Sequence, residues 1–132
     1  DRLWDVCLIG VSLLLYGINR FTPWFKSIPG AGYIFQYHFN DFLGAIVLAA
    51  YWNLLLGFKR ISPWRKWSHL IIIGCVCSVA WEVVAPNFLP RSTPDGWDCV
   101  AYFLGVTDYG MIWRARDCAH QNGKNKEWGK RK

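Results

Sequence analysis

The chain has 132 residues, which is enough for one domain. Only 18% of the residues are charged, whereas 53% are hydrophobic and nine are tryptophan. A soluble domain of similar size usually has about 25% charged residues. The formal net charge is +6, and the basic residues behind it are unevenly placed along the chain. This composition argues against an ordinary soluble domain.

Four apolar segments predict an all-α integral membrane protein with four transmembrane helices. They cover about residues 3–20, 41–58, 69–86 and 94–114. Each approaches the roughly 17–25 residues that cross a bilayer. Asn40 can cap the second helix, with Asp41 in its first turn. Ser92 or Thr93 can cap the fourth helix, with Pro94 at its first position.

A soluble four-helix bundle is the alternative all-helical fold. The helices of such a bundle carry a polar face that repeats every 3.6 residues. Residues 42–50 and 70–81 have no such face. We therefore interpret the chain as a multi-pass membrane protein.

Basic residues divide unequally between the two sides that four spans would create. Twelve Lys and Arg residues fall with the termini and the middle connection, and only Arg20, Lys26 and Arg91 fall on the other side. Cytoplasmic loops carry the excess of Lys and Arg. We therefore expect both termini in the cytoplasm and the connections 19–41 and 86–93 outside.

The charged tail and the cysteines have simple structural interpretations. Residues 115–132 are polar and basic, and we expect a disordered cytoplasmic segment that anionic lipid attracts. Nucleic-acid binding is not expected, because no stacking motif accompanies the charge. The five cysteines, at positions 7, 75, 77, 99 and 118, are interpreted as small apolar residues rather than disulfide partners or metal ligands.

Ionisable residues between the third and fourth spans mark a candidate site. Glu82, Arg91, Asp95 and Asp98 lie close together in the sequence. Ionisable side chains at membrane depth cost several kcal/mol, so they face a cavity, pair with one another and mark sites. Tyr102 follows Asp98 by four residues and therefore shares its helix face.

The first outer connection adds His38, Asn40 and Asp41 at the head of the second helix. Residues 21–39 are aromatic, and we expect either a loop that covers the site or a surface loop at headgroup level. Asp41 and Asp95 are equally well explained as helix-start residues. Glu82 serves no helix terminus, so it is the strongest functional candidate.

Glu82, Arg91 and the segment 98–105, Asp-Cys-Val-Ala-Tyr-Phe-Leu-Gly, resemble the signature of the VanZ-like membrane proteins. That signature has a Glu late in one span, an Arg in the next connection, and Asp-x3-Asn-x2-Gly opening the last span. Glu82, Arg91, Asp98 and Gly105 match it, and Tyr102 stands at the Asn position. The resemblance implies a protein of the bacterial plasma membrane and cell envelope. It also implies a link to resistance against the glycopeptide teicoplanin, but no established reaction.

Two functional hypotheses follow. In the first, an outward-facing cleft binds a polar lipid headgroup or a cell-wall precursor: its carboxylates accept hydrogen bonds and Arg91 pairs with an anionic group. The residues expected to bind the ligand are Glu82, Arg91, Asp95, Asp98, Tyr102, His38, Asn40 and Asp41. In the second, the protein is a membrane-embedded hydrolase or transferase for a lipid-linked substrate. Glu82 and Asp98 are then the catalytic candidates, one as general acid and one as general base.

No cofactor is expected, because no spacing in the sequence matches a known metal motif. A variant of the enzyme hypothesis places a divalent ion on Glu82, Asp98, Asp41 and His38, which are suitable ligand types. Membrane lipid is the expected partner. A transporter would require an oligomer, since four spans form a pathway only in that way and no internal repeat is evident.

Overall fold

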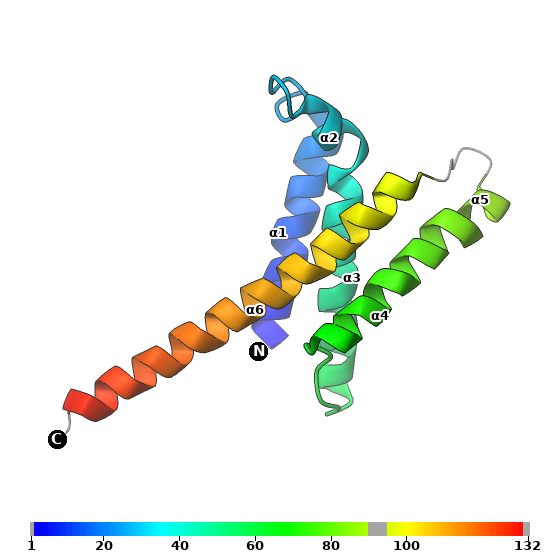
Figure 1. The fold of residues 1–132 in the computed structure, drawn as a ribbon. Helices are drawn as coiled ribbons and strands as arrows, with labels where there is room; N and C mark the ends of the chain where they lie inside the picture. Colours follow the sequence, from blue (N-terminus) through cyan, green and yellow to red (C-terminus); the bar gives the residue numbers. More distant parts are fainter. Residues whose placement is uncertain (1, 90–94, 131–132) are drawn as a thin grey trace.

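The computed structural model describes residues 2–89 and 95–130, which form helices and turns without a strand (Figure 1). Three helices are long: α1 (Arg2–Phe21), α3 (Phe39–Phe58) and α6 (Gly96–Lys130). A fourth rod consists of α4 (Trp67–Ser78), the π-helix η1 (Val79–Val84) and α5 (Ala85–Phe88) in direct succession. The short α2 (Gly32–Tyr37) lies in the connection from α1 to α3.

Three stretches are long and apolar enough to cross a membrane: α1, α3 and the rod Trp67–Phe88. They agree within two residues with the spans predicted at 3–20, 41–58 and 69–86. Only 17% to 33% of each span is buried inside the protein. Because such large exposed apolar surfaces are rare on soluble monomers, these helices indicate a membrane protein. α6 is also long enough, but Asp98, Asp108 and its polar second half make it less apolar than the other three.

The contact between α3 and α6 is the centre of the fold, with α1 packed on α3 and α4 packed mainly on α6. Ala45, Ala49 and Ala50 of α3 are at most 1% exposed. A Cβ added at Gly105 of α6 would meet the carbonyl oxygen of Phe42 and the side chain of Ala45. Small residues of this kind let membrane helices approach closely. The larger core residues are Leu70, Ile73 and Cys77 of α4 and Tyr102, Val106, Tyr109 and Trp113 of α6.

Pro86 explains why the rod Trp67–Phe88 contains a π-helix. Proline lacks an N–H, and its ring crowds the carbonyl group four residues earlier, which is that of Glu82. The helix widens at this point, and the N–H of Ala85 donates to the carbonyl of Ala80, five residues earlier. π-helical turns are rare and occur frequently at functional sites. The widened turn carries Glu82, the strongest candidate from the sequence.

The prediction of a disordered tail at 115–132 differs from the structure over residues 115–130, and residues 131–132 lie outside the described part of the chain. α6 continues as one helix to Lys130 and extends away from the other helices (Figure 1). No proline follows residue 94, so nothing in the sequence interrupts the helix. Where the helix leaves the bundle, the Arg114 guanidinium lies 3.9 Å from the ring centroid of Trp67. Polar composition alone therefore misidentified a helical extension as a disordered segment.

The close α3–α6 contact predicts a specific cost for enlarging Gly105. Gly105→Ala should destabilise the protein by about 1–3 kcal/mol, because the methyl group would push α6 away from the α3 backbone. Thermal unfolding in detergent measures the effect. Gly10→Ala is the matched control, since a Cβ there meets nothing within 4 Å. A Gly105→Ala protein as stable as the control would contradict the packing described here.

Candidate functional site

Three separate parts of the chain bring polar side chains together: the start of α3, the π-helix η1 and the start of α6. We call these residues the polar cluster: His38, Asp41, Glu82, Asp95, Asp98 and Tyr102. All six were predicted as site residues from the sequence. Arg91, which was predicted with them, lies outside the described residues.

Tyr102 connects the three parts of the polar cluster. Its side chain is 3% exposed. Its hydroxyl group lies 3.4 Å from Oδ1 of Asp41 and 3.4 Å from Oε1 of Glu82. One O–H therefore serves two carboxylates, one on α3 and one on η1. Both distances are long for an O–H···O bond, so each carboxylate keeps capacity to accept further donors.

His38 and Asp98 form the second half of the cluster. Nδ1 of His38 lies 2.7 Å from Oδ1 of Asp98, and the two side chains are 14% and 18% exposed. The contact joins the α2–α3 junction to α6. The carboxylates of Asp98 and Glu82 also act electrostatically on Asp41. Glu82 and Asp98, the pair predicted as acid and base, have different hydrogen-bond partners: the Asp95 N–H and the Tyr102 hydroxyl for Glu82, and His38 for Asp98.

Asp95 has two roles at the start of α6. Its Oδ1 accepts a hydrogen bond of 3.0 Å from the N–H of Trp97, as expected of a helix-start residue. Its own N–H donates to Oε2 of Glu82 at 2.7 Å. Both oxygens of Glu82 therefore have partners contributed by or adjoining α6. This explains how a carboxylate is held in place at the end of an apolar rod.

Asn40 has a different role from its neighbour Asp41. Asn19 of α1 is fully buried, and its Nδ2 donates to Oδ1 of Asn40 at 3.0 Å and to the carbonyl of Phe35 at 2.7 Å. The ring of Phe35 stacks on Phe25 at 5.2 Å between centroids. The connection predicted as either a covering loop or a surface loop at headgroup level is a folded aromatic unit anchored by Asn19. Asn40 helps to fix this unit and also lines the adjoining cavity.

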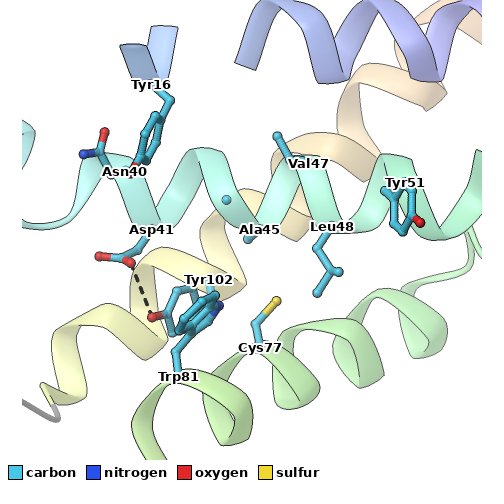
Figure 2. Close-up of a pocket in the computed structure, with 11 residues that line it drawn as sticks. Tyr16, Asn40, Asp41, Ala45, Val47, Leu48, Tyr51, Cys77, Trp81 and Tyr102 are labelled. Carbon is cyan, nitrogen blue, oxygen red and sulfur yellow. Dashed lines mark hydrogen bonds between the residues drawn. The ribbon is translucent and has the colours of Figure 1, made fainter. Parts of the chain in front are cut away.

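A cavity of about 460 Å³ adjoins the polar cluster (Figure 2). Asp41 and Tyr102 lie at its polar end, where the dashed line in Figure 2 marks their hydrogen bond. Farther along, Leu48 of α3 and Cys77 of α4 point toward each other. Its volume falls within the roughly 300–1,000 Å³ of typical small-molecule sites. The carboxylate of Asp41 therefore borders a mostly apolar space that a ligand can fill.

Three residues of the cluster are also close enough together to hold a metal ion. Ligand atoms of His38, Asp95 and Asp98 all lie within 4.8 Å of one another. Imidazole and carboxylate ligands suit Zn²⁺ or Mn²⁺. This trio differs from the predicted set, since Glu82 and Asp41 are instead joined by Tyr102.

A second polar cluster at the opposite end of the helices was not predicted. Asp5 of α1 is 2% exposed and accepts hydrogen bonds from Tyr109 Oη at 2.9 Å and Trp113 Nε1 at 3.1 Å. Nη2 of Arg65 lies 3.8 Å from the same carboxylate. Asp5, an ionisable residue within the first apolar segment, was the sequence feature from which this cluster could have been predicted. This cluster ties α1 to α6.

No family model, no curated protein and no solved structure matches the chain. The likeness to VanZ-like proteins therefore rests on the signature residues Glu82, Arg91, Asp98 and Gly105. Gly105 has a packing role at the α3–α6 contact, whereas Glu82 and Asp98 belong to the polar cluster.

Proposed function

We propose that this chain is a VanZ-like membrane protein whose polar cluster binds a polar headgroup or a cell-wall precursor at the outer surface. The observation that carries the proposal is the convergence of Asp41, Glu82 and Asp98 from three helical segments into one cluster, in which Asp41 lines the end of a cavity. Ionisable side chains at membrane depth cost several kcal/mol, so a group of carboxylates retained at one place favours a functional role. A role in tolerance of glycopeptide antibiotics is part of the proposal.

The proposed membrane arrangement makes α6 the fourth span and places both termini in the cytoplasm of a bacterial cell. Residues 96–113 are long enough to cross, and they pack between α3 and α4 rather than facing lipid on all sides. A membrane helix that packs against protein tolerates more polar residues than a helix surrounded by lipid. The division of Lys and Arg supports the orientation.

A membrane-embedded hydrolase or transferase is the second candidate. What favours it is the placement of two carboxylates, Glu82 and Asp41, on either side of one hydroxyl group beside a cavity. Paired carboxylates in different surroundings can divide the roles of acid and base. Turnover of a lipid-linked substrate would distinguish this candidate from a binding protein.

Replacing Glu82 by Gln tests the proposal in cells. Gln has the same size, and a neutral amide is less costly than a carboxylate at membrane depth, so the variant should accumulate normally. Growth or antibiotic tolerance that depends on the protein should nevertheless be lost. Immunoblotting of membranes measures abundance alongside the phenotype. Full function at normal abundance would show that Glu82 is structural.

Asp5→Ala is the matched control for a carboxylate with a structural role. It leaves the buried donors of Tyr109 and Trp113 without an acceptor, at about 1–3 kcal/mol each. This variant should lose function only in proportion to its lower abundance. The contrast separates loss of a site from loss of folded protein.

Cysteine labelling tests the orientation. In a background without the native cysteines, a membrane-impermeant reagent added to intact cells should label Ser27→Cys and not Ser62→Cys. Ser27 lies in the α1–α2 connection and Ser62 between α3 and α4, and both are exposed. The reverse pattern would place the polar cluster at the cytoplasmic surface.

A further inference from the structure

The charge of the polar cluster restricts the chemistry of its ligand. The cluster contains four carboxylates and one imidazole, and within residues 2–89 and 95–130, which do not include Arg91, no Lys or Arg forms an ion pair with it. Carboxylates accept hydrogen bonds and attract cations, and they repel anions. The hydroxyl of Tyr102 is a shared and distant donor for Asp41 and Glu82 at 3.4 Å. A cationic group with several N–H donors would supply the hydrogen bonds that these carboxylate oxygens can still accept.

The cavity adds a second requirement. Its polar end is formed by Asp41 and Tyr102, and the wall beyond them is mostly apolar: Gly44, Ala45, Val47, Leu48, Cys77 and Trp81. A Cβ added at Gly44 would meet nothing within 4 Å, so the space beside it is open. The cavity runs along α3, a helix that is long and apolar enough to span a membrane. A ligand that fills both regions has a polar end and a hydrocarbon end.

We propose that the polar cluster and this cavity bind a lipid that carries a protonated primary amine. The ammonium group, with three N–H donors and no acceptor, lies against Asp41. The hydrocarbon chain extends from there past Gly44 and Leu48 between α3 and α4. This inference rests on the proposed function and specifies the ligand of the same site.

Matched probes separate the amine from the chain. The full chain, purified in detergent, is titrated at pH 7 with hexadecylamine, hexadecanol and ethylamine in a calorimeter. Hexadecylamine should bind about tenfold or more tightly than hexadecanol, because charge-assisted hydrogen bonds are roughly twice as strong as neutral ones. Ethylamine should show no measurable binding, since it leaves the cavity empty.

Two variants test the two halves of the site. Asp41→Asn should lower the affinity for hexadecylamine about tenfold and leave that for hexadecanol unchanged, which also reports that the variant is folded. Gly44→Leu should weaken both ligands by filling the cavity. Asp117→Asn, at a side chain that is 59% exposed, and Gly10→Leu, where a Cβ meets nothing within 4 Å, are the controls and should bind as wild type does.

Three results would overturn the inference. Equal affinities for hexadecylamine and hexadecanol would remove the amine from the proposal. Tighter binding of hexadecyl phosphate would identify an anionic ligand. Saturable Zn²⁺ or Mn²⁺ binding that excludes the amine and disappears in His38→Ala would identify a metal site at His38, Asp95 and Asp98. Each of these would leave the loss of function in Glu82→Gln standing, so the failure of this inference is distinct from failure of the proposed function.

Discussion

The structure depends on carboxylates whose hydrogen-bond partners come from distant parts of the chain. A carboxylate at membrane depth has little water to bind, so each one needs protein partners in defined positions. Glu82 obtains them from the N–H of Asp95 and the hydroxyl of Tyr102. Asp5 obtains them from Tyr109 and Trp113. α6 supplies or adjoins the partners in both cases, so its position is fixed at its start and again at Tyr109 and Trp113, before the helix leaves the bundle.

Between these two places the contact between α3 and α6 is almost free of polar groups. Ala45, Ala49 and Ala50 meet α6 where Gly105 allows the backbones to come close. Lipid is as apolar as these residues, so packing rather than hydrophobic burial holds such helices together. The fit of Gly105 against Phe42 and Ala45 is too close for either helix to shift without a clash. It therefore sets the relative depth of Asp41 on α3 and of Asp98 and Tyr102 on α6.

Glu82 is placed by a local defect in its own helix. Pro86 removes one backbone hydrogen bond, and the π-helical turn Val79–Val84 accommodates the change. Such a turn rotates the residues that follow it relative to a regular α-helix. The defect lies on the rod whose α4 segment packs mainly on α6. The bonds from Asp95 and Tyr102 then hold the widened turn against the rest of the protein.

Much of the fold could be predicted from the sequence, because long apolar segments report membrane spans directly. Three spans agree with the structure within two residues, and the candidate residues His38, Asp41, Glu82, Asp95, Asp98 and Tyr102 do converge. Their pairing could not be predicted, because it depends on the rotation of each helix, which an apolar helix without a polar face does not reveal.

Other features were missed for physical reasons that differ from one another. Asp5 and Asn19 lie in the first apolar segment, where single polar residues are easily overlooked, yet both are buried and hydrogen-bonded to other parts of the chain. The extension of α6 to Lys130 was missed because its residues are polar on all sides. Tyr102 was predicted as a site residue, but its contact with two carboxylates depends on how α3, η1 and α6 pack together, which the sequence does not show.

Cross-linking across the polar cluster tests the central claim, that α3 and α6 bring the predicted site residues together, most directly. In a background without the native cysteines, His38→Cys and Asp98→Cys are combined and treated in membranes with a short bis-methanethiosulfonate reagent. Because the wild-type side chains lie 2.7 Å apart, we predict efficient intramolecular cross-linking. The pair His38→Cys and Asp117→Cys, with its second site on the extension of α6, should not react. Absence of the first cross-link, although both cysteines can be labelled singly, would contradict the account.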